Sequence, residues 1–299
     1  MEQIKSVCIV GSGYMGWQIA LQCALHNYPV NLHDVSEQAI FKARQSISNE
    51  LETLVSVGKL SPEGKNATLN RIKSEPDLSN AATNVDLIIE AVPERLEIKR
   101  KLFTELDKIS CPDTILATNS SSIRISKIED ATNRKDKVLN THFYSTPWRS
   151  QIVELMGGTS TSTKTIELVK HFMQSIEMVP LLVRKESTGF IFNRVWRAIK
   201  RECLHLVDDG VATYEDVDRA WMCIFETEFG PFGLMDKVGL DVVRDIENVY
   251  YEESKDERDS PPNVILEKIS RGELGIKTGV GFYNYPNPAY TNPHWIKDS

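Results

Sequence analysis

The strongest indication of how this chain folds is Gly11-Ser12-Gly13-Tyr14-Met15-Gly16. It follows an apolar run at residues 6–10, and the apolar residues between positions 19 and 24 recur at the spacing of one helix face. Glycines in this pattern let the backbone turn tightly and approach a pyrophosphate, whose charge the N-terminus of the next helix stabilises. The stretch therefore predicts a strand–turn–helix unit that binds a dinucleotide through Gly11, Gly13 and Gly16.

The next β-rich run, residues 30–33, indicates which dinucleotide is bound. It is followed by Asp34, which comes 18 residues after Gly16. A carboxylate there can accept hydrogen bonds from both hydroxyls of the adenosine ribose and repels a 2′-phosphate. Val35 and Ser36 follow, and no arginine stands there to hold such a phosphate. The pattern favours NAD over NADP, with FAD binding and nucleotide sensing as alternatives.

The first half of the chain alternates β-rich runs with amphipathic segments. An amphipathic helix is expected at residues 94–109, where Leu96, Lys99 and Leu102 share helical spacing. Strands are expected at residues 6–10, 30–33, 86–92, 114–118, 138–144, 152–156 and 179–183. This alternation predicts an α/β fold, a doubly wound parallel sheet covered by helices.

The β pattern stops at about Arg184, and the rest of the chain has a helical period. Helices are expected at residues 190–207, 215–224, 240–252 and 262–271. We therefore predict two domains, a dinucleotide-binding domain at residues 1–184 and a helical domain at residues 185–299.

Composition excludes several functional classes. The 299 residues are 41% hydrophobic, enough to fill a core, and the net charge of −7 disfavours binding to nucleic acid or an anionic membrane. No apolar run approaches the roughly 20 residues that cross a bilayer, and the N-terminus lacks the pattern of an export signal. The five cysteines form no C-x-x-C pair, which gives no zinc signature and suggests no metal. The expected location is cytoplasmic.

Two residues stand out as a candidate proton-transfer pair. His142 lies near the end of the strand expected at residues 138–144, where a doubly wound sheet presents its ligands. Glu154 lies within an apolar run, where a carboxylate is costly without a partner. A His–Glu pair satisfies both, because the carboxylate fixes the imidazole tautomer while the other ring nitrogen handles a substrate proton. The alternative is that Glu154 meets a lysine or arginine and His142 is merely packed.

Two further polar groups have alternative interpretations. Asn119-Ser120-Ser121-Ser122 follows the strand expected at residues 114–118, and capping of a helix explains it as well as a catalytic role does. Asn193 lies in an apolar helical start, where its amide needs either an internal partner or a substrate.

Together these signals resemble one family, the L-3-hydroxyacyl-CoA dehydrogenases, almost from end to end. The segments that carry the resemblance lie at residues 11–20, 86–94, 112–122, 189–194, 230–236, 238–241 and 277–283. The resemblance implies a Rossmann-type domain followed by an all-α C-terminal dimerisation domain, and hence a homodimer active in fatty acid metabolism.

The resemblance also implies roles for individual residues. His142 corresponds to the catalytic base, Glu154 to the acid that orients it, and Ser121 and Asn193 to polar contacts at the reacting oxygen. Residues implied around the NAD cofactor, besides the three glycines, are Met15, Asp34, Glu94, Lys99, Ser121, Ser145 and Lys277. The implied reaction is oxidation of the 3-hydroxyl of a 3-hydroxyacyl-CoA, such as 3-hydroxybutyryl-CoA, to the 3-keto product.

Two departures from the family pattern bear on the substrate. Where the family reads His-Phe-Phe-Asn-Pro, Ser145 replaces the amide, and Trp148 and Arg149 follow in the same loop. Residues 45–64 carry one base, Lys59, against three acids, so attraction for the phosphates of CoA is weak there. The alternative substrate is a small free hydroxy acid, as in gulonate and carnitine dehydrogenases, with Arg149 as a carboxylate clamp. A third hypothesis is a non-catalytic NAD-binding protein, as the lambda-crystallins illustrate.

Overall fold

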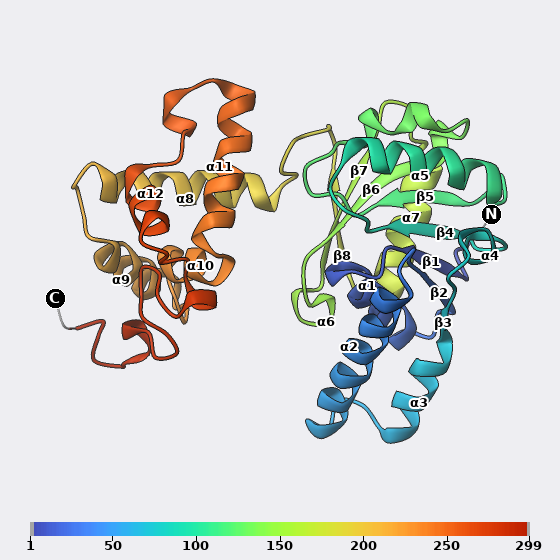
Figure 1. Cartoon of the computed structure of the whole chain (residues 1–299), viewed down its shortest axis with the longest axis horizontal. Coiled ribbons are helices and arrows are strands. Elements are labelled where there is room, and N and C mark those ends of the chain that lie inside the picture. The colour runs from blue at the N-terminus through green and yellow to red at the C-terminus, as the bar shows by residue number, and fades with distance from the viewer. Residues whose placement is uncertain (1–2, 298–299) are drawn as a thin grey trace. The chain divides into compact units, whose positions relative to one another are not determined.

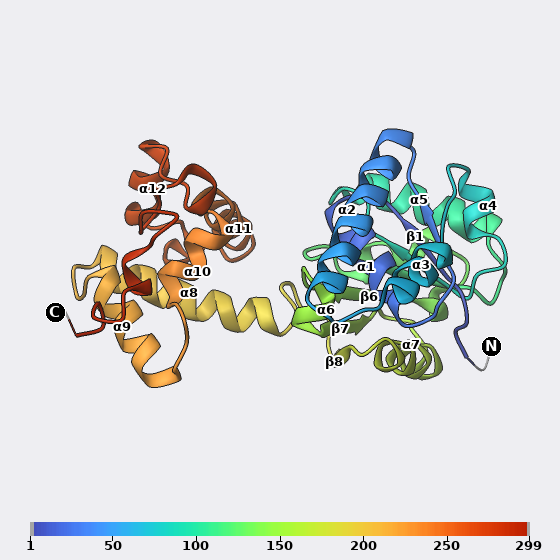
Figure 2. The same ribbon diagram turned by 90° about the horizontal axis from the view of Figure 1, so that it is seen from below.

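The computed structural model describes residues 3–297. The chain forms two compact units that divide between Ile191 and Phe192. The N-terminal unit contains the β-sheet and its covering helices, and the C-terminal unit is built from helices (Figures 1 and 2). The predicted fold class, an α/β domain followed by a helical domain, is confirmed.

An eight-stranded sheet organises the N-terminal unit within the described residues. Its strands are β1 (Val7–Val10), β2 (Val30–His33), β3 (Ile72–Ser74), β4 (Leu87–Glu90), β5 (Ile115–Thr118), β6 (Val138–Phe143), β7 (Ile152–Gly157) and β8 (Val179–Val183). Their order in space is β3-β2-β1-β4-β5-β6-β7-β8. The chain thus winds outward from β1 in one direction and from β4 in the other, which leaves a crevice at their carboxyl ends. Neighbouring strands run parallel except β6 and β7, which are antiparallel.

Helices cover both faces of this sheet (Figures 1 and 2). They are α1 (Tyr14–Leu25), α2 (Glu37–Ser56), α3 (Pro62–Arg71), α4 (Leu78–Ala82), α5 (Leu96–Ile109), α6 (Pro147–Ser150) and α7 (Thr163–Ser175). In β1, Val7 and Ile9 belong to one buried apolar cluster and Cys8 and Val10 to another, as alternation along a strand requires. Because both faces of the strand are buried, its sequence is a continuous apolar run.

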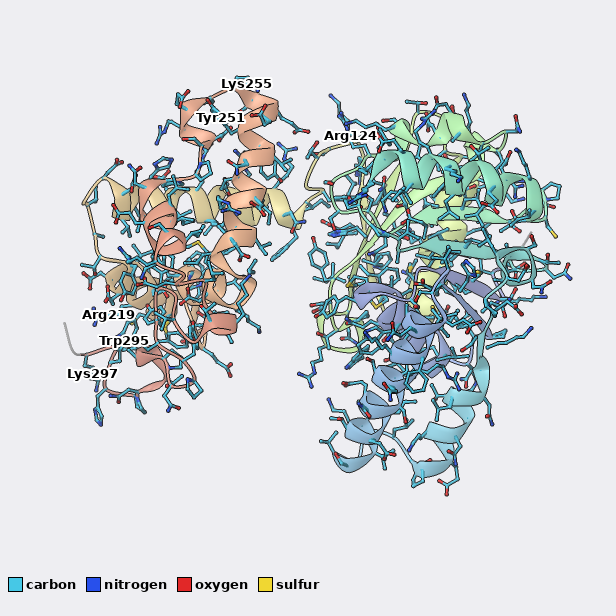
Figure 3. All side chains as sticks on the ribbon, viewed as in Figure 1. Arg124, Arg219, Tyr251, Lys255, Trp295 and Lys297 are labelled. Carbon is cyan, nitrogen blue, oxygen red and sulfur yellow. The ribbon has the colours of Figure 1, made fainter. Side chains whose placement is uncertain are left out.

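The C-terminal unit packs five α-helices of the described residues around one apolar cluster. They are α8 (Phe192–Asp208), α9 (Tyr214–Phe225), α10 (Pro231–Val238), α11 (Leu240–Ser254) and α12 (Asn263–Ser270). Helix α8 begins two residues later than the sequence predicts, because Phe190 has a left-handed φ of 54° that interrupts a helix. The guanidinium of Arg219 on α9 lies 4.5 Å from the ring of Trp295 and donates to its carbonyl oxygen, which ties down the C-terminal segment (Figure 3).

Two carboxylates are buried in the core of the C-terminal unit. Asp218 accepts hydrogen bonds from the backbone amides of Phe232 and Gly233 and from the hydroxyl of Tyr283. Asp236 in turn accepts from the amides of Phe282 and Tyr283. Burial raises the pKa of Asp218 to about 6, although these hydrogen bonds oppose the shift. The carboxylates thus bind the start of α10 and the segment at residues 282–283 into one core.

No helix within residues 3–297 has the length and apolar character needed to span a membrane.

Candidate active site

The glycine turn after β1 leaves no room for side chains at two of its positions. A Cβ atom on Gly11 would lie 2.6 Å from the carbonyl oxygen of Ala91, and Gly11 also has a left-handed φ of 99°. A Cβ on Gly16 would lie 1.7 Å from the carbonyl oxygen of Gly11. Both glycines therefore hold the turn closely against α1 and the end of β4.

Gly13 differs, because a Cβ added there would meet no protein atom within 4 Å. It is the N-cap residue of α1, and no side chain caps that helix end. Free backbone amides at a helix N-terminus, beside open space, form an anion site. The turn accordingly fits the pyrophosphate of a dinucleotide.

Asp34 stands directly after β2 and is fixed by two neighbouring loops. One carboxylate oxygen accepts from the amide nitrogen and the hydroxyl of Ser12, at 2.8 and 3.0 Å. The other accepts from the amide of Ser36 at 3.0 Å. The half-buried carboxylate thus has a defined position next to the glycine turn.

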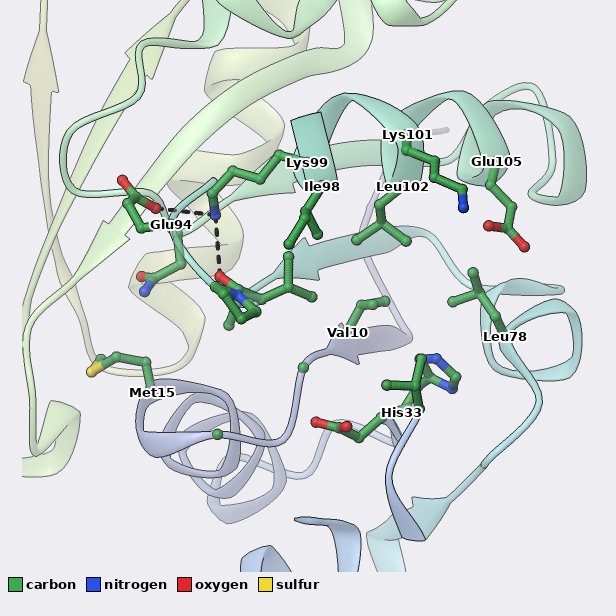
Figure 4. A pocket seen from close by; sticks show the side chains of 18 of the residues that line it. Val10, Met15, His33, Leu78, Glu94, Ile98, Lys99, Lys101, Leu102 and Glu105 are labelled. Carbon is green, nitrogen blue, oxygen red and sulfur yellow. Dashed lines mark hydrogen bonds and ion pairs between the residues drawn. The ribbon is translucent and has the colours of Figure 1, made fainter. Parts of the chain in front are cut away.

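A cavity of about 1110 Å³ opens beside this turn, as Figure 4 shows. Its size is slightly above the roughly 300–1,000 Å³ typical of ligand sites. Of the residues predicted around the cofactor, Gly11, Gly13, Met15, Asp34, Glu94, Lys99 and Ser121 line it. Apolar side chains, including Leu78 and Leu102, complete the wall. A single cavity thus brings together groups that lie more than 100 positions apart in the sequence.

Three charged residues form a cluster at the wall of the cavity. The buried ammonium of Lys99 lies 2.6 Å from Glu90 and 3.2 Å from Glu94 (Figure 4 draws its contact with Glu94). Burial raises the pKa of Glu90, against the opposing effect of Lys99. For Glu94 burial also favours the neutral acid, but Lys99 and hydrogen bonds from Ser120 and Ser122 prevail and lower its pKa to about 2. Lys99 thereby keeps Glu94 ionised at the edge of the cavity.

The antiparallel pairing of β6 with β7 places His142 directly opposite Glu154. The Nδ1 atom of His142 lies 3.0 Å from Oε2 of Glu154, and its Nε2 atom lies 3.1 Å from the hydroxyl of Ser121. Glu154 is 0% exposed. The three side chains therefore form one hydrogen-bonded chain, and its Ser121 end lines the cavity.

The loop after β5 supports this arrangement and does not cap an α-helix. The side-chain oxygen of Asn119 accepts from the amide of Phe143 at 2.8 Å, and the hydroxyl of Ser120 accepts from the amide of Ile123. Asn119 thus joins the ends of β5 and β6. Beyond β6, the side-chain oxygen of Gln18 on α1 accepts from the amide of Thr146 at 2.6 Å and anchors the following loop.

Several residues predicted for the site do not line the cavity. Asn193 is on α8 and Lys277 is in a 3-10 turn, so both belong to the C-terminal unit, and Lys277 forms an ion pair with Asp241. Ser145 is exposed and lies outside the lining of the cavity, and Arg149 is exposed on α6. Roles for these four residues stay predictions.

The structure also identifies site residues that the sequence analysis did not single out. Glu90 was detectable, because a carboxylate in the buried apolar strand β4 requires a partner. Tyr144, whose hydroxyl donates to Glu154 at 2.8 Å, carried no comparable signal. Within residues 3–297 no group of three or more His, Cys, Asp or Glu side chains could hold a metal ion.

Comparison with protein-family models assigns both units. Residues 6–187 match the model described as 3-hydroxyacyl-CoA dehydrogenase, NAD binding domain. Residues 189–285 match the C-terminal domain of the same family. The cofactor predicted from the glycine turn and Asp34, NAD, is thereby confirmed.

Curated proteins and solved structures agree with this assignment. The chain is 36% identical over 279 residues to a 3-hydroxybutyryl-CoA dehydrogenase of Clostridioides difficile, which covers 93% of this chain and 99% of the relative. It is 30% identical to 5-formyl-3-hydroxy-2-methylpyridine 4-carboxylate 5-dehydrogenase of Mesorhizobium japonicum, covering 94% and 91%. The crystal structure of (S)-3-hydroxybutyryl-CoA dehydrogenase from Ralstonia eutropha superimposes with a TM-score of 0.89 at 32% identity, covering 95% and 100%. The chain therefore belongs to the 3-hydroxyacyl-CoA dehydrogenase family and is, as its sequence predicts, an NAD-dependent oxidoreductase.

Proposed function

We propose that this protein oxidises the 3-hydroxyl of a 3-hydroxyacyl-CoA, such as 3-hydroxybutyryl-CoA, to the 3-keto product, with His142 as the general base. The observation that carries the proposal is the hydrogen-bonded chain Ser121–His142–Glu154, which ends at a cavity bordered by the glycine turn. A base, its orienting carboxylate and a dinucleotide site are the parts that this chemistry needs.

In the proposed mechanism the carboxylate of Glu154 accepts the Nδ1–H of His142. This fixes the tautomer that leaves Nε2 free to take a proton. Ser121 lies at Nε2 and marks the place of the reacting oxygen. Nε2 removes the hydroxyl proton as the C–O bond becomes a carbonyl, and Glu154 stabilises the imidazolium that forms. A bound NAD would supply the acceptor for the hydride that leaves C3.

Other residues are proposed to bind the substrate or the cofactor and not to transfer protons. Asn193 is proposed as a second polar contact to the reacting oxygen. Asp34 would accept hydrogen bonds from the ribose hydroxyls, and the open space at Gly13 would admit the pyrophosphate. The remaining residues proposed at the cofactor are Gly11, Met15, Gly16, Glu94, Lys99, Ser121, Ser145 and Lys277.

The test is turnover together with cofactor binding. Purified protein should reduce NAD in the presence of 3-hydroxybutyryl-CoA. His142→Gln should lower kcat roughly 100-fold or more while NADH, titrated by fluorescence, binds as in the wild type. A variant that matches the wild-type rate on every substrate turned over would refute the role of His142. Binding of NADH without turnover on a broad hydroxy-substrate panel would favour the non-catalytic alternative.

A small free hydroxy acid is the second candidate substrate. It is favoured by residues 45–64, which carry one base against three acids, and by the similarity to a pyridine carboxylate dehydrogenase. Rates with 3-hydroxybutyryl-CoA, 3-hydroxybutyrate, gulonate and carnitine discriminate the two classes. A preference for the free acids that Arg149→Ala weakens would support binding of the substrate carboxylate by Arg149. If Arg149→Ala has the same preference as the wild type, that role of Arg149 is excluded.

We also propose that the C-terminal unit forms a homodimer. Val242, Ile246 and Val249 follow one face of α11 and are 41%, 38% and 47% exposed. A second copy of this chain would cover that face. Light scattering should give twice the chain mass for the wild type and for Val211→Asp in an exposed loop, but a monomer for Ile246→Asp. Neither nucleic acid nor a membrane is a proposed partner, and the cytoplasmic location stays a prediction.

A further inference from the structure

Tyr144 contacts the same carboxylate oxygen as the proposed base. Its hydroxyl donates to Oε2 of Glu154 at 2.8 Å, and Nδ1 of His142 lies 3.0 Å from that oxygen. The other oxygen, Oε1, accepts from the backbone amide of Ile191 at 2.9 Å. Tyr144 follows the last residue of β6, so the strand that carries the imidazole also carries the phenol.

We infer that Tyr144 is a positioning residue for the His142–Glu154 pair, one that holds the carboxylate in line with the imidazole and disperses its charge. The inference rests on the proposed function, because it concerns the pair to which proton transfer is assigned. The phenol would act only through Glu154, so it is not itself a catalytic residue.

The direction of the effect follows from the chemistry of the carboxylate. A hydrogen bond donated to a carboxylate favours its ionised form and lowers its affinity for a proton. In a buried pair the first proton taken up belongs to both groups, so weakening either one as a base moves the titration of the pair to lower pH. The hydroxyl of Tyr144 should therefore keep the pair free of a proton, and active as a base, to lower pH.

The groups around Glu154 come from several elements. His142 and Tyr144 face it from β6, the amide of Ile191 faces it from the segment after β8, and Leu181 of β8 is its partner in register. Of these neighbours, His142 and Tyr144 carry ionisable side chains. Substitution of the phenol therefore changes a group that touches the carboxylate directly.

The aromatic ring of Tyr144 has a separate packing role. It meets the His142 ring edge-on with centroids 4.7 Å apart, and the ring of Phe190 stacks on the same imidazole at 4.8 Å. Tyr144→Phe keeps the ring contact and removes only the hydroxyl. This substitution separates hydrogen bonding to the carboxylate from packing against the imidazole.

The experiment compares Tyr144→Phe with Tyr28→Phe. Tyr28 is the matched control, because its hydroxyl pairs with Ser175 and its ring packs against Phe172. The pH profile of kcat/KM for oxidation is measured for both variants and the wild type. We expect the acidic limb of Tyr144→Phe to move upward by about half a pH unit or more, and that of Tyr28→Phe to stay in place. A Tyr144→Phe limb that coincides with the wild-type limb would overturn the inference.

A second measurement does not depend on turnover. The titration of the His142 ring is followed by NMR in the NAD-free protein, and its signal is identified among the six histidines by its loss in His142→Gln. The midpoint should rise in Tyr144→Phe, and an unchanged midpoint would reject the inference. If His142→Gln retains wild-type rates while this midpoint moves, the proposed function fails and the coupling stands. If His142→Gln is inactive, but Tyr144→Phe moves neither the acidic limb of the pH profile nor the midpoint of the His142 titration, only the inference about Tyr144 fails.

Discussion

The carbonyl oxygen of Gly11 occupies the place where a side chain at Gly16 would begin, 1.7 Å from an ideal Cβ atom. The first turn of α1 is thereby held against the loop that ends β1. At Gly13, between them, a Cβ would meet nothing within 4 Å. Two glycines of one turn thus serve different purposes, close packing at Gly16 and open space for a ligand at Gly13.

This difference predicts opposite results for two alanine variants. Gly16→Ala should lower the Tm by several degrees, because backbone would have to shift to relieve the overlap. Gly13→Ala should unfold at the wild-type temperature but bind NADH at least about 10-fold more weakly, since its methyl group would occupy the space proposed for the pyrophosphate. Calorimetry and NADH titration measure the two effects. Equal Tm values for the two variants would contradict the assignment.

Asp34 should set the preference between NAD and NADP. In Asp34→Asn the charge that repels a 2′-phosphate is removed, and the ribose hydroxyls lose an ionised acceptor. We expect the ratio of kcat/KM for NAD to that for NADP to fall about 10-fold or more. Asp113→Asn, which removes an exposed partner of Lys137, is the control and should leave the ratio unchanged. If Asp34→Asn keeps the wild-type ratio of kcat/KM for NAD to that for NADP, the adenosine ribose does not bind at Asp34.

The ion pair between Lys99 and Glu90 should be essential to stability. Both side chains are buried, at 1% and 0% exposure, so Lys99→Met leaves a carboxylate inside the protein without its counter-charge. The free energy of unfolding, measured by chemical denaturation, should fall by about 3–5 kcal/mol. The double variant Lys99→Met/Glu90→Gln should recover part of this loss, because the buried charge is gone. A single variant as stable as the wild type would contradict the prediction.

Asp218 should make the C-terminal unit less stable as the pH rises through mild acid. Its pKa is about 6 in the folded protein, against 3.8 for an ordinary aspartate, so between these values the folded state binds more protons than the unfolded state. The contribution of protonated Asp218 to the free energy of unfolding is fully present below pH 3.8 and is lost as the pH rises through 6. It is on the order of 3 kcal/mol in all.

This effect is measured by hydrogen exchange at the backbone amides of Phe232 and Gly233, which donate hydrogen bonds to the carboxylate of Asp218. Their protection factors should fall across that pH window in the wild type and lose this dependence in Asp218→Asn. Asp216 on the same helix has a lowered pKa, so Asp216→Asn should not remove the dependence. Identical slopes for Asp218→Asn and the wild type would show that Asp218 does not cause the pH dependence.

Much of the N-terminal unit could be predicted because its signals are local. The strands at residues 30–33 and 179–183 have the expected bounds, since short runs with valine and leucine between turn residues favour strands even where, as in β8, the strand is partly exposed. Strand β3 was missed, because Ile72–Ser74 has three residues and one apolar side chain, and pairing with β2 defines it. Helix α10 was missed for a similar reason, since Pro231–Val238 is short and is stabilised through Asp218.

Residue types and their spacing to near neighbours were enough to identify the glycine turn, Asp34 and the candidates His142 and Glu154. Which side chains meet could be seen only in the folded chain. The register of β6 on β7 set His142 opposite Glu154, and the same fold brought Tyr144 to that carboxylate and Lys99 to Glu90. Contacts of this kind depend on how whole strands and helices pack, and neighbouring residues do not encode that packing.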